Sequence, residues 1–134
     1  MSGEGVPSEV AAFIARYVGS VVQLESLLLL AGDAGRRWTV DDVARELRID
    51  RAWAEAQLDV LCGQSLLACD DHPVRRFHYA PPDQRTQETV AALARTYAER
   101  RVSVTSLIFA KPPDALRAFS EAFRFRKDSG GPRG

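Results

Sequence analysis

Four side chains that bind soft metal ions lie close together in the chain: Cys62, Cys69, His72 and His78. Thiolate and imidazole are ligands that zinc prefers, and the Cys-x2-His step from Cys69 to His72 is a plausible metal spacing. The set has no paired CxxC or HxxxH, however, and Cys62 falls in a predicted helix whereas Cys69 falls in a predicted strand. The pattern therefore favours two half-buried thiols and two surface histidines over a metal site. It also gives no sign of an activated thiol, so a redox switch is not predicted.

The remaining polar residues do not form a set with catalytic spacing. Adjacent carboxylates occur at Asp41–Asp42 and Asp70–Asp71, but neighbouring side chains face different directions and serve as caps and turns. We find no glycine-rich phosphate loop and no nucleophile with a matching base. The sequence predicts a protein that is not an enzyme and that carries no cofactor or metal.

Length and composition indicate one ordinary globular domain. The chain has 134 residues, of which 46% are hydrophobic, enough to build a core. Its longest apolar run, 27–31, is far shorter than the roughly 20 residues of a membrane span. The N-terminus does not have the charge and apolar stretch of a signal peptide. We expect a cytoplasmic protein without a membrane span.

Hydrophobic periodicity and capping residues predict a mainly α fold with a small β-hairpin. Thr39 and Asp50 each precede a short amphipathic helix, and two such helices joined by a short turn make a helix-turn-helix. The predicted elements, in chain order, are helices over 9–18 and 20–31, a short strand at 37–38, a helix-turn-helix over 39–64, a hairpin over 66–80, a long helix over 83–110 and a last helix over 114–126. The long helix can bend near 101–106, where β-branched and serine residues cluster. Residues 1–7 and 128–134 are predicted to be flexible tails.

Three segments carry a resemblance to a known family. They are Thr-Val-Asp-Asp-Val-Ala-Arg-Glu-Leu-Arg-Ile-Asp at 39–50, Leu58-x-x-Leu61, and Ser65-Leu-Leu67, where many relatives place glycine at the serine position. With the order of elements, they resemble the winged helix-turn-helix fold, and within it the MarR-like bacterial transcriptional regulators. The resemblance covers nearly the whole chain, over 8–127, but its motifs specify the fold better than the task.

The resemblance implies a dimeric transcriptional regulator that binds double-stranded DNA, with the second helix of the helix-turn-helix in the major groove and the hairpin as a wing. The DNA-contacting residues that it implies are Arg36, Arg37, Arg51, Ala52, Trp53, Arg75, Arg76 and His78. Terminal helices would join two copies into a homodimer. The predicted interface residues are Phe13, Tyr17, Val90, Tyr97, Val104, Leu107, Phe119 and Phe123.

The charge of the predicted helix-turn-helix opposes this function. Residues 39–69 carry three arginines against six carboxylates, and DNA affinity depends on neutralising phosphates with cations. Glu55 and Asp59 lie four residues apart on the helix face expected to meet DNA. Trp53 is better suited to a protein interface, where tryptophan often anchors binding. The alternative is therefore a winged-helix interaction module that docks a protein partner through the Trp53 face.

Overall fold

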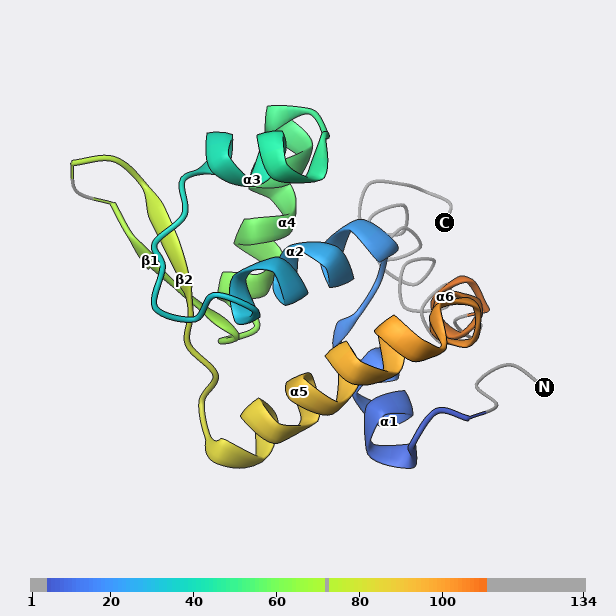
Figure 1. The fold of residues 1–134 in the computed structure, drawn as a ribbon. Coiled ribbons are helices and arrows are strands. Elements are labelled where there is room, and N and C mark those ends of the chain that lie inside the picture. Colours follow the sequence, from blue (N-terminus) through green and yellow to red (C-terminus); the bar gives the residue numbers. More distant parts are fainter. Residues whose placement is uncertain (1–4, 72, 111–134) are drawn as a thin grey trace, which may run out of the picture.

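The computed structural model describes residues 5–71 and 73–110, which form six helices and one two-stranded antiparallel sheet (Figure 1). In chain order the elements are α1 (Ser8–Tyr17), α2 (Val21–Ala31), α3 (Val40–Leu47), α4 (Arg51–Gly63), β1 (Leu67–Asp70), β2 (Arg76–Tyr79), α5 (Gln84–Glu99) and α6 (Arg101–Phe109). The prediction of a mainly α fold with a small β-hairpin is confirmed.

Helix α2 lies at the centre of the described part. It packs against α3, α4 and β2 on one side and against α5 on the other (Figure 1). Its leucines face several directions around the helix, and Leu24, Leu27 and Leu30 are fully buried. Helix α1 packs against α5 and α6, and the Tyr17 carbonyl at its end accepts from the side chain of Gln64, the residue after α4, at 2.9 Å. An apolar helix between two groups of elements therefore joins them through one core.

The hairpin is attached to the core by one face. Leu67 pairs with Tyr79 and Cys69 with Phe77, and Phe77 and Tyr79 are buried as their alternation with Arg76 and His78 predicts. The predicted strand at 37–38 is a single bridge, in which the Trp38 N–H donates to the Phe77 carbonyl at 2.8 Å and the Phe77 N–H donates back at 2.7 Å. These bonds fix the hairpin beside the segment that enters α3.

Side-chain caps set the beginnings of α3 and α4. The Thr39 hydroxyl accepts from the Asp42 N–H and the Asp42 carboxylate accepts from the Thr39 N–H, each at 3.0 Å. The Asp50 carboxylate accepts from the first turn of α4. The helices end at left-handed residues, Arg48 with φ 58° and Ser65 with φ 65°. Serine thus adopts at 65 the conformation for which glycine is usual.

The capping box makes stability depend on pH. The backbone hydrogen bond from Thr39 is the main cause that lowers the pKa of Asp42 below its ordinary 3.8. A lowered folded-state pKa contributes stability above the unfolded pKa, and this contribution is lost as the pH falls through the folded-state value. We expect Asp42→Ala to reduce the free energy of unfolding by about 1 kcal/mol at neutral pH.

Urea unfolding of the two proteins between about pH 2 and pH 7 checks this prediction. The difference in stability between wild type and Asp42→Ala should shrink at the acid end. Asp42→Asn, which keeps an acceptor oxygen without the charge, should lose less stability than Asp42→Ala. A difference that is the same at every pH would contradict the role of the carboxylate.

The predicted helix over 83–110 is broken at Arg100, where φ is −134° and ψ is 55°, directly before the segment 101–106 in which the sequence indicated a bend. Asp83 begins α5 as a cap, as the sequence indicates. At the break, the Tyr97 hydroxyl donates to Glu25 of α2 at 2.8 Å and accepts from Arg101 at 3.0 Å. The change of direction allows α6 to pack against α1 with Val104 and Ile108 buried.

Several terminal predictions lie outside the described residues. These are the helix over 114–126, the tail over 128–134 and the first four residues of the tail over 1–7. The rest of the N-terminal tail is described: Gly5 has φ 82° and lies against Arg100, and Pro7 precedes α1. A side chain at position 5 would collide with the Arg100 guanidinium, so this segment is fitted to the break between α5 and α6.

Candidate functional site

The side of α4 that faces away from the core carries a group of exposed apolar residues next to charged ones. Ala54, Leu58 and Leu61 are buried on the inner side. The uncharged residues exposed on the helix are Ala52, Trp53, Ala56, Val60 and Gly63, which we call the α4 outer face, and the charged Arg51 and Asp59 are exposed beside them. Trp53 is 49% exposed and Val60 45% exposed. Apart from the indole N–H of Trp53, these side chains offer no hydrogen-bonding group.

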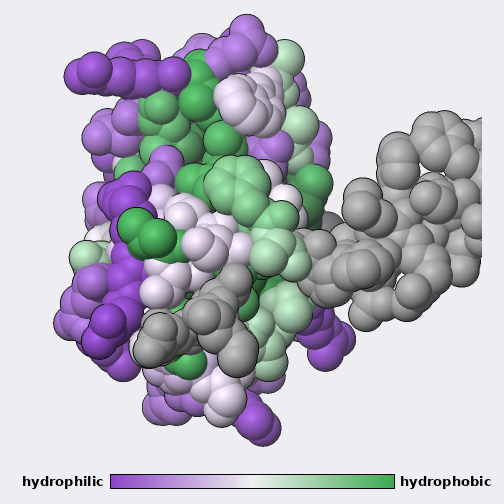
Figure 2. Space-filling view, turned by 90° about the vertical axis from the view of Figure 1, so that its right-hand side faces the viewer, coloured by the Kyte–Doolittle hydropathy of each residue, from purple (hydrophilic) through white to green (hydrophobic). Residues whose placement is uncertain are grey.

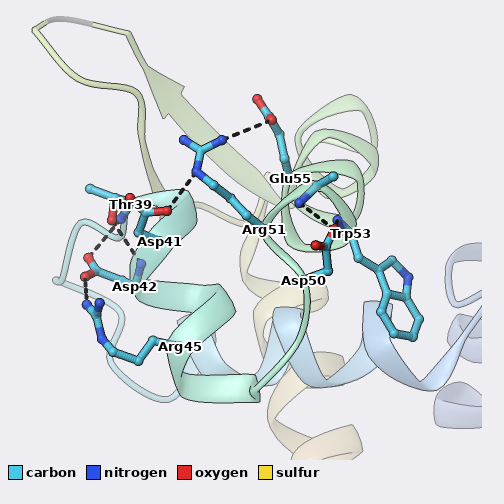
Figure 3. A network of polar contacts seen from close by, with 9 residues as sticks. Thr39, Asp41, Asp42, Arg45, Asp50, Arg51, Trp53 and Glu55 are labelled. Carbon is cyan, nitrogen blue, oxygen red and sulfur yellow. Dashed lines mark hydrogen bonds and ion pairs between the residues drawn. The ribbon is translucent and has the colours of Figure 1, made fainter.

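The first turn of α4 fixes the position of Trp53. The Asp50 carboxylate accepts from the backbone N–H groups of Ala52 at 3.0 Å and Trp53 at 3.3 Å. Figure 3 shows the indole ring pointing away from the polar residues of α3 and α4. The spacing of Ala56 and Val60 from Trp53, three and seven residues, was the signal in the sequence that these two residues share its face.

A chain of ion pairs borders the α4 outer face. The Arg51 Nε lies 2.7 Å from Asp41 Oδ1, and Arg51 Nη1 lies 3.9 Å from Glu55 Oε1 (Figure 3). Arg51 therefore joins α3 to α4 instead of standing alone at the start of the helix. Both of its contacts are largely exposed, so we expect them to contribute little to stability.

Arg75 points inward toward α4. Its guanidinium lies over the Phe77 ring, 4.9 Å from the centroid, and binds Glu55 Oε2 at 3.1 Å and Asp59 Oδ1 at 2.5 Å. Its Nε donates to Cys69 Sγ at 3.3 Å. We call Arg75 with Glu55, Asp59 and Cys69 the arginine clamp.

The environment of Arg75 favours its charged form. Hydrogen bonds to Cys69 and then Asp59 raise the pKa of Arg75 above its ordinary range. Arg75 lies two residues before Phe77 and four before Tyr79, so the alternation of the strand indicates that it faces the same way as these buried residues. The structure thus places the two neighbouring arginines of the predicted wing differently, since Arg76 is exposed at the position opposite Asp70.

The other predicted DNA-contacting residues lie around Trp38. The Arg36 guanidinium stacks on the Trp38 ring, 3.7 Å from its centroid, and lies 3.9 Å from Asp42. Arg37 Nη1 lies 3.0 Å from His78 Nδ1. Ala52 and Trp53 lie on the α4 outer face instead. The predicted set is therefore divided among the α4 outer face, the arginine clamp and the Trp38 region, while Arg51 pairs with carboxylates of α3 and α4 and Arg76 is exposed on β2.

The predicted dimer residues are mostly inside the chain's own core. Phe13, Val90, Tyr97 and Val104 are buried, and Tyr17 and Leu107 are half-buried against the core. Phe119 and Phe123 lie outside the described residues. The apolar stripe that suggested a seam between two subunits is covered by the packing of α5 and α6 on α1 and α2. These four residues belong to the core of the chain, and a homodimer through the terminal helices stays a prediction.

No group of three or more His, Cys, Asp and Glu within 5–71 and 73–110 is arranged to hold a metal ion, and His72 lies outside these ranges. A cavity of about 310 Å³ lies between α2, Tyr79 and α5. The described residues that line it are uncharged, and Gln87 and Tyr79 supply its polar side chains. The cavity is separate from the α4 outer face, with which it shares no lining residue.

Hydrophobic side chains also reach the surface on the side of the molecule where α6 lies (Figure 2). Val102 is 77% exposed and Phe109 is 81% exposed on that helix. The chain continues beyond Ala110 at this end. The α4 outer face differs from this surface of α6 in two ways: ion pairs border it, and a side-chain cap fixes the beginning of its helix.

Comparison of the chain with protein-family models, curated proteins and solved structures finds no match. Among the described helices, none is both long and apolar enough to cross a membrane by itself. The fold and the site define a mainly α protein in which exposed apolar residues on one helix lie beside arginines paired with carboxylates. The function is therefore inferred from this geometry.

Proposed function

We propose that the chain is a winged helix-turn-helix module, with α3 and α4 as the helix-turn-helix and β1 and β2 as the wing, that docks a protein partner through the α4 outer face. The observation that carries this proposal is the apolar outer face of α4. Trp53 and Val60 are about half exposed on the face that a DNA-reading helix would turn to the major groove.

An apolar outer face suits protein docking better than base recognition. Base edges are read mainly by side chains with hydrogen-bond donors and acceptors, whereas Ala56 and Val60 can contact only apolar groups such as a thymine methyl. The centres of protein interfaces, by contrast, are depleted of charge and often contain an aromatic anchor. Trp53 has the chemistry of such an anchor, and its neighbours are small enough to let a partner approach.

The edge of the outer face indicates the chemistry of the partner. Glu55 and Asp59 lie beside it, and Arg75 supplies one positive charge between these two carboxylates. Complementary charge around an apolar centre increases specificity and the rate of association. The partner that fits best presents an apolar patch bordered by lysine or arginine.

Site-specific photo-crosslinking tests this function. A photoreactive phenylalanine derivative replaces Ala56 on the α4 outer face in one variant and Val102 on α6 in a matched control. We expect a defined protein to be crosslinked in cells from position 56 and not from position 102. The crosslinked protein must then bind the unmodified chain as a purified pair. Crosslinks from position 56 to the chain's own second copy would overturn the proposal of a different partner.

DNA recognition is the second candidate, and the exposed arginines favour it. The Arg45 side chain is 73% exposed and that of Arg51 is 63% exposed. Ion pairs this exposed contribute little, so phosphates can replace the carboxylates as their partners. This candidate keeps the mechanism in which a dimer places two helix-turn-helix units in neighbouring major grooves.

Fluorescence anisotropy with a pool of random duplexes at about 50 and 200 mM salt separates the two candidates. If the docking function is correct, we expect no salt-sensitive binding of duplex DNA by the wild type. The anisotropy of the duplexes should be the same with Arg75→Ala and with Arg76→Ala. Binding of duplexes at low salt would favour DNA recognition over docking if the bound duplexes share a two-fold motif and if Arg76→Ala weakens the binding.

A further inference from the structure

The cavity of about 310 Å³ between the end of α2 and α5 takes its shape from short side chains. Ala31 lies at the end of α2, and Ala91 and Ala94 lie three residues apart on α5. These residues leave space that longer side chains would fill. Binding sites for small molecules have volumes of about 300–1,000 Å³, and a cavity of about 150 Å³ holds benzene. The cavity can therefore hold a molecule of about 12 non-hydrogen atoms.

Tyr79 lines this cavity, and its hydroxyl has no partner in the described part of the chain. Tyr79 is 9% exposed, its hydroxyl oxygen is buried, and that oxygen makes no hydrogen bond with any residue of 5–71 or 73–110. Buried polar groups in proteins almost always have a hydrogen-bond partner, because an unpaired one has lost its hydration without compensation. Phenylalanine would fill the same space without this cost. A molecule bound in the cavity would lie next to Tyr79 and can supply the missing hydrogen bond.

The lining of the cavity disfavours a charged ligand. None of the described residues that line it is charged, so an ion would lose its hydration without gaining a counter-charge. Burial raises the pKa of Tyr79 above its ordinary 10.0, so the hydroxyl stays protonated at neutral pH and can donate. Leu28 and Val90 supply apolar surface, and Gln87, exposed on α5, is the other polar side chain of the lining. The lining fits an uncharged, mostly apolar molecule that carries a hydrogen-bond acceptor.

We propose that the cavity between α2, β2 and α5 binds an uncharged, mostly apolar molecule with a carbonyl group, whose oxygen accepts a hydrogen bond from the Tyr79 hydroxyl. Because this hydroxyl is buried, the Tyr79 ring turns slightly toward the molecule as it enters. The apolar part of the molecule lies against Leu28 and Val90. The cavity shares no lining residue with the α4 outer face, so the proposal does not rest on what that face binds.

The position of the cavity lets a bound molecule contact both groups of elements that α2 joins. Tyr79 ends β2, which packs against α2 with α3 and α4, whereas Val90 lies on α5, which packs against α1. A molecule that binds only the folded chain stabilises it by mass action. We therefore expect binding to raise the midpoint of thermal unfolding, by an amount that grows with the concentration of the molecule.

Two-dimensional NMR of the isotope-labelled full chain, titrated with 2-acetylnaphthalene, tests this site. The probe is an uncharged bicyclic ketone of the size that the cavity accepts. We expect saturable shifts of the backbone amide signals of Ala31, Ala91 and Ala94, with a dissociation constant below about 1 mM. The anion 2-naphthoate has nearly the same shape and should bind at least ~10-fold more weakly, because the lining offers it no counter-charge. Equal affinity for the ketone and the anion would overturn the proposed class of ligand.

Tyr79→Phe tests the hydrogen bond to the ketone. The variant keeps the ring and should weaken binding of 2-acetylnaphthalene by about 3–10-fold, the usual contribution of one hydrogen bond. It should leave binding of 2-ethylnaphthalene unchanged, because this hydrocarbon has the same ring system without the oxygen. Loss of an unpaired hydroxyl should not lower the midpoint of thermal unfolding. An equal effect on the two probes, or no effect on either, would overturn the role of Tyr79.

Two exposed alanines on α5 test where the probe binds. Ala91 lines the cavity, so Ala91→Phe should fill the space, and 2-acetylnaphthalene should no longer bind. Ala98 lies on the same helix outside the lining, and Ala98→Phe, the matched control, should bind as the wild type does. Circular dichroism confirms that both variants are folded. The same affinity in the two variants, or no saturable shifts in the wild type below about 1 mM, would overturn the proposal.

Discussion

Phe77→Ala should reduce the free energy of unfolding by about 3–5 kcal/mol, the largest effect that we expect from a single substitution in this chain. Phe77 is fully buried, and its ring lies under the Arg75 guanidinium. Its backbone also makes the bridge to Trp38. Removing the ring leaves a cavity where the hairpin, the entry to α3 and α2 meet. Small domains have only about 5–15 kcal/mol of stability, so much of it would be lost.

Urea unfolding followed by circular dichroism measures this effect, and the slope of the transition shows whether the unfolded state has changed. Phe109→Ala is the matched control, because Phe109 is 81% exposed on α6. We expect the control to change stability by less than about 0.5 kcal/mol. A loss below about 1 kcal/mol in Phe77→Ala would mean that the hairpin is not held to the core through this ring.

Trp53→Ala should weaken binding of the partner identified by crosslinking by at least about 30-fold, which corresponds to about 2 kcal/mol. The indole is the largest exposed apolar group on the α4 outer face. The substitution keeps the backbone N–H at position 53, from which the Asp50 carboxylate accepts a hydrogen bond, so the cap of α4 remains. The loss should therefore come from the interface and leave the free energy of unfolding within about 0.5 kcal/mol of wild type.

Isothermal titration of the purified pair gives the dissociation constant. Val60→Ala, on the same face, should weaken binding by a smaller factor, and Val102→Ala on α6 should have no effect. Equal affinity of wild type and Trp53→Ala would place the interface elsewhere on the chain. Weakening by Val102→Ala together with full binding by Trp53→Ala would move it to α6.

Local signals in the sequence predicted most of the described elements. The caps at Thr39, Asp50 and Asp83 lie where expected, because each is a short-range bond between a side chain and the next turn. The β-branched and serine residues at 101–106 indicated a bend, but not a full break or its position at Arg100. No proline or glycine marks the break, where α6 packs on α1 and Tyr97 contacts Glu25.

The site was predicted less well than the fold, for a physical reason. Periodicity shows which side of a helix or strand is buried, but it does not show what buries it. The stripe containing Val90 and Val104 fitted either a core or a seam between subunits, and the structure shows both residues buried by the chain's own helices. Arg75 was grouped with Arg76 by sequence proximity, whereas the alternation of β2 places it on the side of Phe77.

The position of α1 has a consequence for the order in which the chain folds during synthesis. This helix is made before the other described elements, yet its main contacts are with α5 and α6, near the end of the described chain. Ribosomes add about 5–20 residues per second, and contacts between distant segments form only after both have emerged. Helix α1 is therefore among the last to reach its native contacts, while α2, α3, α4 and the hairpin can already assemble around their shared core.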